Sequence, residues 1–448
     1  RAHPARSSLL APRYPFVVPG GRFRELYYWD TYWIAAGLLA CDMFVTTRHV
    51  IDNLLAYVAD FGFVPNGGRC YYLNRSQPPL LSEMVVEYVD RAFDAGLNDD
   101  ARSLAAAALP LLGTEYDWWM RPDNGHVVVV RGFTLNRFFV RARGPRPESY
   151  REDVTTAENV SSPDGKLDVY SNLAAAAESG WDFSSRWMTN ATLDTTAATR
   201  IVPVDLNAIM LKFERNLAAL YELVAADNAT QGAWRRAKAA AGLERHRAPT
   251  TTAAAARYVR AAEARARAID AILWRPDRGV WRDAHLDDHA AFANRSEVAS
   301  DFIMLWAGAA DDFDDHRKLA ILDALDGSGL LQPGGILTSV VDSGQQWDAP
   351  NAWPPLQLLI LKGLAKLRLR RADDLARRTA NVWLDSNYEA WNATGDMYEK
   401  YDAYNPGAGG GGGEYAPQLG FGWTNGVVLS LLTEPVVADE SSSSSSSS

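Results

Sequence analysis

Two segments of the chain combine charged side chains with aromatic rings in a pattern that suits carbohydrate binding. Residues 19–33 read PGGRFRELYYWDTYW, and residues 345–355 read QQWDAPNAWPP. The hydroxyl groups of a sugar need charged or amide partners that fix direction, while its C–H faces pack well on Trp or Tyr rings. Because the segments lie more than 300 residues apart, we predict one pocket assembled from distant loops.

Two acidic residues in similar surroundings are candidates for cleaving a glycosidic bond. That reaction needs one carboxyl group to protonate the leaving oxygen and a second to attack the carbon or activate a water. Asp182 lies in ESGWDFSSRW, where aromatic neighbours can exclude water and raise its pKa, as a general acid requires. Glu399, in YEKYD just before a glycine-rich stretch, is the candidate base. In the alternative interpretation each acid caps a helix or pairs with Arg186 or Lys400.

Three arginines in separate loops are candidates for binding the hydroxyl groups of a sugar. The planar guanidinium of Arg22, Arg75 or Arg146 suits such a partner or a carboxylate. The alternative is surface ion pairing, which contributes little, but the Gly-, Pro- and Asn-rich contexts favour binding. Four of the 15 tryptophans are candidates for stacking platforms, with a place in the core as the alternative: Trp29, Trp181, Trp347 and Trp353.

Other chemistries lack their sequence signals. The chain has 7 His, with no HExxH helix and no paired CxxC, so we predict no metal site. It has no Gly-X-Ser-X-Gly elbow, and the glycine run at 407–413 lacks the Lys-Ser/Thr of a phosphate loop. Phosphate binding is therefore a weak interpretation of this run, and a metal is not needed.

Apolar residues at helical spacing recur along most of the chain. They predict helices at about 32–43, 47–60, 79–96, 101–112, 203–226, 229–242, 252–274, 298–309, 314–325, 353–370, 372–387 and 423–433. Strand signals are confined to 127–130 and the run at 134–140, which predict a small hairpin. The Trp-, Gly- and Pro-rich segments fall between helices, which predicts an all-α helical toroid with its site at one rim. An irregular two-domain α protein is the alternative.

Composition excludes several classes of partner. The net charge of −10 and the scattered arginines argue against nucleic acid. The chain contains no run of about 18 apolar residues, so we predict no membrane span. The 448 residues are enough for one large domain or for two to three of average size, and we predict a catalytic domain at 1–436 and a disordered Ser-rich tail at 437–448.

Glycosylation sequons bear on the compartment. The chain has six Asn-X-Ser/Thr sequons, at Asn74, Asn159, Asn190, Asn228, Asn294 and Asn392. They favour a secreted or extracytoplasmic glycoprotein, with a cytoplasmic location as the alternative. We expect Asn74 to be unmodified because it lies within a candidate site segment. Cys41 and Cys70 are too few for a disulfide framework, and we predict that both are buried thiols.

Residues 19–32 and 346–355 resemble the two signature motifs of trehalases of glycoside hydrolase family 37. The likeness continues through PNG at 65–67, YLNRSQPP at 72–79, RPESY at 146–150, ESGWD at 178–182, EKYD at 399–402, residues 409–415 and GFGWTNG at 420–426. It covers essentially the whole chain except the serine tail.

The resemblance implies a fold and an activity. The family fold is an (α/α)6 barrel, and its members hydrolyse α,α-trehalose to two glucose molecules with inversion and without a cofactor. At matching positions, Asp182 resembles the general acid and Glu399 the general base. The implied sugar-binding residues are Arg22, Trp29, Asp30, Asn66, Arg75, Ser76, Gln77, Arg146, Pro147, Glu148, Gly180 and Glu414. The glycine-rich segment with Glu414 resembles the family's lid over the disaccharide.

One departure from the family concerns the start of the chain. Family members carry a longer stretch before the first signature than the 18 residues found here. It stays open whether the first N-terminal helices of the barrel are lacking, which would leave apolar surface on the last helices unpaired. Another exo-acting glycosidase on the same barrel and a catalytically silent trehalose-binding protein are the alternative functions.

Overall fold

A closed ring of helical elements forms the centre of the molecule. The computed structural model describes residues 6–226, 230–244, 248–287 and 295–434. Within these ranges, each ring element contacts the next and the last contacts the first: α1 (Asp30–Ala40), α3 (Leu81–Asp94), α7 (Val204–Ala225), the 3₁₀ helix Ala299–Leu305, α11 (Pro354–Lys366) and α13 (Gly422–Thr433). The ring elements are covered on most sides; in α7 every residue from Val204 to Leu220 is buried.

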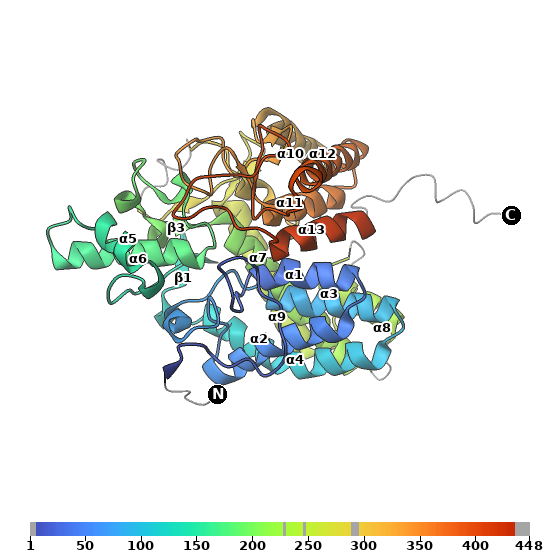
Figure 1. The fold of residues 1–448 in the computed structure, drawn as a ribbon. Coiled ribbons are helices and arrows are strands. Elements are labelled where there is room, and N and C mark those ends of the chain that lie inside the picture. Colours follow the sequence, from blue (N-terminus) through green and yellow to red (C-terminus); the bar gives the residue numbers. More distant parts are fainter. Residues whose placement is uncertain (1–5, 227–229, 245–247, 288–294, 435–448) are drawn as a thin grey trace.

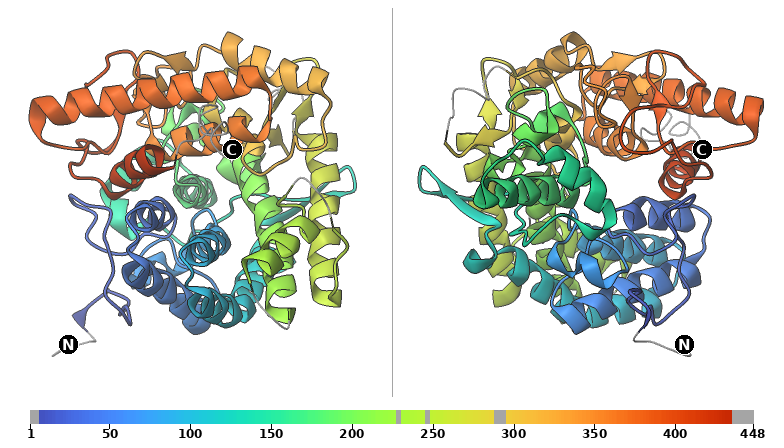
Figure 2. Two further views of the ribbon diagram at one scale, coloured as in Figure 1. Left: turned by 90° about the vertical axis from the view of Figure 1, so that its right-hand side faces the viewer. Right: turned by 60° about the vertical axis from the view of Figure 1, so that its left-hand side comes forward.

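Further helices surround this ring. They are α2 (Phe44–Phe61), α4 (Asn98–Trp119), α8 (Gln231–Ala240), α9 (Ala253–Ile272), α10 (Asp315–Gly327) and α12 (Arg370–Thr394). α2 packs on α1 and α3, α4 on α3 and α7, α8 and α9 on α7, and α12 on α11. α12 buries Ala372, Leu375, Ala376, Thr379 and Trp383, a one-sided stripe that is typical of an outer helix. Two concentric layers of helices agree with the predicted toroid, which Figure 2 shows in two views.

Helices from the two ends of the chain complete the ring. Figure 1 shows α1 and α13 side by side, and they contact each other extensively. A Cβ added to Gly426 would lie 2.0 Å from the carbonyl oxygen of Trp33, and one added to Gly37 would lie 2.5 Å from the Cα of Gly426. Only glycine allows this backbone approach. Near the end of α13, Leu432 is 64% exposed.

Strands are short and occur in antiparallel pairs. β1 (Val127–Val130) and β2 (Phe133–Asn136) form a hairpin whose turn residues, Arg131 and Gly132, both have positive φ, as a two-residue turn requires. The predicted hairpin is therefore confirmed, although its second strand is shorter than the run at 134–140. The other pairs are β3 (Ile201–Val202) with β6 (Ala284–His285), β4 (Trp274–Arg275) with β5 (Val280–Trp281), β7 (Leu331–Gln332) with β8 (Gly335–Ile336), and β9 (Asn351–Ala352) with β10 (Tyr401–Asp402).

The predicted helices overlap observed helices, with three differences. Within the predicted segment 298–309, Ala299–Leu305 forms a 3₁₀ helix rather than an α-helix, and a turn that contains Gly308 at φ +76° follows it. Two helices were not predicted, α5 (Tyr150–Thr156) and α6 (Pro163–Glu178). The inner face of α6 is largely alanine, which gives a weak apolar signal, but the side chain of Ser162 caps the helix by accepting from the backbone N–H of Gly165.

The prediction of buried cysteines is wrong. Cys41 and Cys70 are exposed free thiols. Cys41 follows the last residue of α1, and Cys70 begins a short 3₁₀ helix, so both lie where the chain leaves the packed layers. No helix among the residues described is long and apolar enough to cross a membrane. The serine tail lies outside these residues, as do Asn228 and Asn294.

Candidate active site

Long loops enclose a cavity of about 300 Å³ at one end of the helical ring. Trp29 and Asp30 line it from the start of α1, Trp353 from the residue before α11, and Trp423 from the first turn of α13. The N-terminal ends of ring helices therefore define one mouth of the barrel. In Figure 1, α5, α6 and the long connections lie together at this end of the molecule. The cavity volume lies at the lower end of the range for small-molecule sites.

Asp182 reaches the cavity just after α6. Gly180 turns the chain there with φ +80°, and a Cβ at this position would lie 2.5 Å from the ring of Trp29. Burial raises the pKa of Asp182 to about 7, while Arg146 lowers it and Glu414 raises it further. A carboxyl group with this pKa is half protonated at neutral pH, as proton donation to a leaving group requires.

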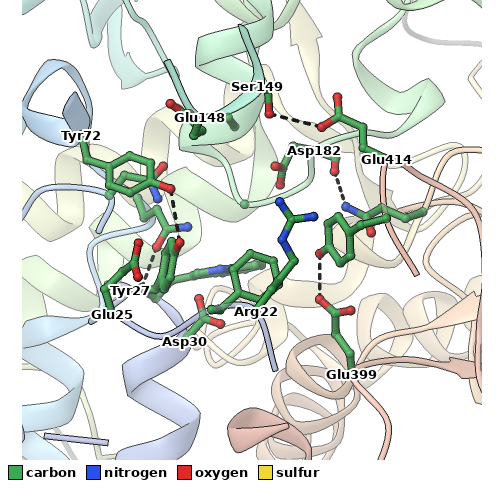
Figure 3. A pocket seen from close by; sticks show the side chains of 18 of the residues that line it. Arg22, Glu25, Tyr27, Asp30, Tyr72, Glu148, Ser149, Asp182, Glu399 and Glu414 are labelled. Carbon is green, nitrogen blue, oxygen red and sulfur yellow. Dashed lines mark hydrogen bonds between the residues drawn. The ribbon is translucent and has the colours of Figure 1, made fainter. Parts of the chain in front are cut away.

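Glu399 enters the same cavity from the segment before β10. It is 1% exposed. The Tyr415 hydroxyl donates to its Oε1 at 2.8 Å and the backbone N–H of Gln418 donates to its Oε2 at 3.1 Å. Burial raises the pKa of Glu399, whereas the charge of Lys400 and both hydrogen bonds lower it. Figure 3 shows Asp182 and Glu399 with the other carboxyl groups around this cavity.

The structural pairings considered for the two acids are not found. Arg186, fully buried, instead binds Asp205 and Asp283 with bidentate hydrogen bonds of 2.6–3.0 Å. The Lys400 ammonium group donates to Oε1 of Gln346 at 2.8 Å. Asp182 and Glu399 are therefore available for chemistry in the cavity.

Two buried arginines hold the wall near α5. Arg75 donates through Nε to Oδ1 of Asn66 at 2.8 Å and pairs with Glu148. Its Nη1 is buried without a hydrogen-bond partner, so one donor remains for a ligand. Arg146 is held by Asp153 at 2.7 Å.

The positive charges of Arg75 and Arg146 act on the carboxyl groups of Glu148 and Glu414 nearby. Burial raises the pKa of Glu148, but Arg75 and Arg146 together bring it below its usual value. Nη2 of Arg146 also lies 3.7 Å from Oε1 of Glu414. Glu148 is therefore ionised at neutral pH and can accept hydrogen bonds from a ligand.

Asp30 and Arg22 complete the polar lining. Burial raises the pKa of Asp30 to about 8, and the charges of Glu399 and Asp182 raise it further. Asp30 is therefore largely protonated at pH 7 and can donate a hydrogen bond. Arg22 is exposed, with its guanidinium 5.0 Å from the ring centroid of Tyr415.

A tryptophan stack supports one wall of the cavity. Trp347 and Trp353 are parallel, with ring centroids 4.0 Å apart, and Trp29 lies 5.5 Å from Trp347. All three line the cavity. Trp181 does not line it; its ring stacks on Trp347 at 5.4 Å, and the Arg186 guanidinium lies 4.6 Å from its ring centroid. Three of the four predicted platforms therefore face the cavity, and the fourth supports them.

Comparison with known proteins identifies the family. The family described as Trehalase matches residues 1–435. This chain belongs to the trehalase family. It is 39% identical to a probable trehalase of Oryza sativa subsp. japonica, over 97% of this chain and 74% of that protein. It is 40% identical to the trehalase of Homo sapiens, over 96% of this chain and 69% of that protein. The predicted family and enzyme class, a glycoside hydrolase, are confirmed.

Solved structures confirm the fold class of this trehalase-family chain. Neutral trehalase Nth1 from Saccharomyces cerevisiae superposes with a TM-score of 0.71 at 24% identity, over 94% of this chain and 74% of that one. A GH63 mannosylglycerate hydrolase from Thermus thermophilus gives 0.54 at 16% identity, over 94% and 96%. At these identities the likeness concerns the fold alone, an all-α (α/α)6 barrel.

The cavity brings together most of the site residues predicted from the sequence. Both proposed catalytic residues line it, as do ten of the twelve sugar-binding candidates: Arg22, Trp29, Asp30, Asn66, Arg75, Gln77, Arg146, Glu148, Gly180 and Glu414. Ser76 and Pro147 are absent from the lining. The Ser76 hydroxyl donates to the carbonyl of Val64 at 2.6 Å, and its N–H donates to Glu178 at 3.0 Å. Ser76 therefore orders the loop that carries its neighbours Arg75 and Gln77.

Several lining residues were not singled out by sequence reasoning. They include Glu25, Tyr27, Tyr71, Tyr72, Ser149, Gln346, Tyr415 and Phe421. Most stand within one to three positions of a predicted residue in the same motif. The sequence signal for these residues was their position within a motif. Side-chain direction in a loop follows no fixed period, so it could not show which of them face the cavity.

The glycine-rich segment 407–413 leads directly into Glu414 and Tyr415, which line the cavity. Glu414 at its end accepts a hydrogen bond from the Ser149 hydroxyl at 3.3 Å. The N–H of Gly411 donates to Oδ1 of Asn351 at 2.8 Å. A Cβ at Gly410 would lie 2.3 Å from the same oxygen, so glycine permits this close approach. The predicted lid movement stays a prediction.

Proposed function

We propose that this chain hydrolyses α,α-trehalose to two glucose molecules, with inversion at the attacked carbon. The observation that carries the proposal is that two carboxyl groups in different environments face one polar cavity. Burial holds the pKa of Asp182 at about 7, while Glu399 accepts two hydrogen bonds that favour its ionised form. The family relationship supplies the substrate.

In this mechanism the two carboxyl groups act on opposite sides of the glycosidic bond. Asp182, in its protonated form, donates its proton to the glycosidic oxygen as the C–O bond breaks. Glu399 accepts a proton from a water, whose oxygen attacks the anomeric carbon from the other face. Asp182 ends ionised and Glu399 ends protonated, so one proton returns through solvent before the next turnover.

The other lining residues suit a small, highly hydroxylated substrate. Arg75 has an uncommitted buried donor, Glu148 is an ionised acceptor, and Asp30 is a protonated donor. Trp29, Trp347 and Trp353 add apolar surface to the lining, against which sugar C–H groups can pack. Hydrogen bonds between a charged side chain and a hydroxyl group are stronger than those between two neutral groups.

The anomer of the released glucose tests this proposal. Purified protein is mixed with trehalose and the products are followed by proton NMR before mutarotation. Inversion at one carbon yields one β-glucose and one α-glucose from each trehalose. Two α-glucose molecules would instead indicate a retaining mechanism, and binding without glucose would indicate a catalytically silent protein. Preferential cleavage of maltose, kojibiose or sucrose would show another exo-acting glycosidase.

We also propose that the protein is exported and glycosylated. Four sequon asparagines among the residues described are exposed: Asn74, Asn159, Asn190 and Asn392. Asn74 adjoins the cavity-lining Arg75, so we expect it to remain unmodified. Protein expressed in a secretory host should lose mass when treated with an N-glycosidase, and peptide mapping should locate the occupied positions. Unchanged mass would favour the cytoplasmic alternative.

A further inference from the structure

Three consecutive residues of the second signature motif bind the loop that carries Asp182. Nε2 of Gln346 donates to the backbone carbonyl of Asp182 at 2.6 Å, and the N–H of Trp347 donates to the carbonyl of Phe183 at 3.0 Å. Asp348 accepts from the N–H of Ser185 at 2.7 Å. We call residues 346–348 the clamp.

Asp348 anchors the clamp within the protein. It is fully buried. Its carboxylate accepts from the hydroxyls of Ser184 at 2.8 Å and Ser339 at 2.6 Å, and also from Ser343. A buried carboxylate with this many donors is held in one position.

The clamp is also joined to the segment that carries Glu399. Oε1 of Gln346 accepts from the ammonium group of Lys400 at 2.8 Å, and Lys400 follows Glu399 directly in the chain. Gln346 and Lys400 are both buried, at 3% and 0% exposure. The two ends of one amide group thus connect the backbone of the acid to the neighbour of the base.

Resting on the proposed function, we infer that Gln346 and Lys400 are positioning residues that set the placement of Asp182 relative to Glu399. Hydrolysis needs both carboxyl groups in reach of one glycosidic bond at the same moment. The two acids lie 217 positions apart in the chain, so noncovalent contacts must fix their relation. A displacement of about 1 Å in such a site can cost about a hundredfold in rate.

Lys400 adds an electrostatic contribution to this role. Its positive charge lowers the pKa of Glu399 and thereby favours the ionised base. The groups that face Glu399 from other elements are Tyr415, the N–H of Gln418, Arg22 and the carboxyl group of Asp30. Removing the positive charge of Lys400 therefore raises the pKa of Glu399. The amide group of Gln346 is neutral, so its removal takes no charge away from the surroundings of the base.

Three variants at neighbouring glutamines test the clamp. Gln346→Met removes both side-chain hydrogen bonds at similar volume. Gln346→Glu keeps an acceptor for Lys400 but loses the donor to Asp182. Gln345→Met is the matched control, because Gln345 is half-buried and does not line the cavity. Each is assayed with trehalose for kcat and KM at its pH maximum, with glucose as a competitive inhibitor and near-ultraviolet circular dichroism as a check of folding.

In both Gln346 variants, kcat should fall about a hundredfold. KM and the inhibition constant of glucose should stay within about threefold of the values for the unaltered chain. Gln345→Met should behave like the unaltered chain. Wild-type kcat in Gln346→Glu would overturn the inference. So would a loss that appears in KM, which would make Gln346 a substrate-binding residue, or an equal loss in Gln345→Met. If Gln346→Met does not fold, Gln346→Glu provides the decisive measurement.

Variants of Lys400 test the link to the base. Lys400→Met should lower kcat and move the acid limb of the kcat/KM profile to higher pH, whereas Lys400→Arg, which keeps the charge, should leave the limb in place. An unmoved limb in Lys400→Met would refute the electrostatic part. If the unaltered chain releases no glucose, the proposed function fails; if the unaltered chain is active and the Gln346 variants match it, the clamp alone fails.

Discussion

The hydrogen bond from Tyr415 to Glu399 offers a direct test of how the proposed base is kept ionised. The hydroxyl donates to Oε1 at 2.8 Å in a partly buried setting. Tyr415→Phe removes this donor but keeps the ring that contacts Phe23 and Arg22. A hydrogen bond to a charged group contributes about 1.5–3 kcal/mol. Because it favours the ionised form, its loss must raise the pKa of Glu399.

The expected consequence is confined to one side of the pH profile. A base must be deprotonated to act, so a higher pKa moves the acid limb of kcat/KM to higher pH. At about 1.36 kcal/mol per tenfold change, activity at a fixed pH on that limb should fall about ten- to hundredfold. The basic limb, which reports the acid Asp182, should move much less.

The assay is glucose release from trehalose between pH 4 and 9, in buffers of about constant ionic strength. Tyr72→Phe is the matched control: Tyr72 lines the same cavity, but its hydroxyl faces that of Tyr27 at 3.3 Å rather than Glu399. An acid limb that is unchanged in Tyr415→Phe, or displaced equally in Tyr72→Phe, would refute the assigned role of this hydrogen bond.

Three further outcomes follow from the same structure. Asp182→Asn and Glu399→Gln should each lower kcat by about 10²–10⁴ with folding retained, because each removes one proton-transfer group; near-normal turnover in either would remove that residue from the mechanism. In the unaltered chain, kcat/KM should fall about tenfold per pH unit well above the Asp182 pKa of about 7, since only its protonated form donates; a flat profile to pH 9 would contradict this role. Gly426→Ala should lower the free energy of unfolding by at least about 1–3 kcal/mol, because its Cβ would lie 2.0 Å from the Trp33 carbonyl. Urea unfolding would measure this, with Gly327→Ala, where a Cβ meets nothing within 4 Å, as the control that should stay near the unaltered value.

Much of the fold was predictable because helical periodicity reports burial locally. α7 and α9 follow their predicted ranges to within two residues at each end, since a long apolar face repeats every three to four positions. α6 was missed because its buried face is largely alanine. The cysteines were misjudged because residue type gives only an average tendency to be buried, and both lie at helix ends.

Much of the site was predictable from the types of residue in its motifs, but its internal pairings were not. Arg186 stands four positions after Asp182 and was a credible partner for it. In the folded chain it binds Asp205 and Asp283 instead. Likewise, Ser76 lies inside a predicted binding motif but its hydroxyl bonds to Val64. The direction of a loop side chain depends on what packs against it, which the local sequence does not contain.

The sequence by itself determined the helical elements and the chemical groups available: two acids in aromatic surroundings, arginines in loops and glycines at tight turns. Only the tertiary structure decided that Asp182 and Glu399 face one cavity and that Gln346 lies between their segments. The physical reason is that a pKa and a catalytic geometry depend on burial and on neighbouring charges. Here those are supplied by segments far apart in the chain, which come together only when the ring of helices closes.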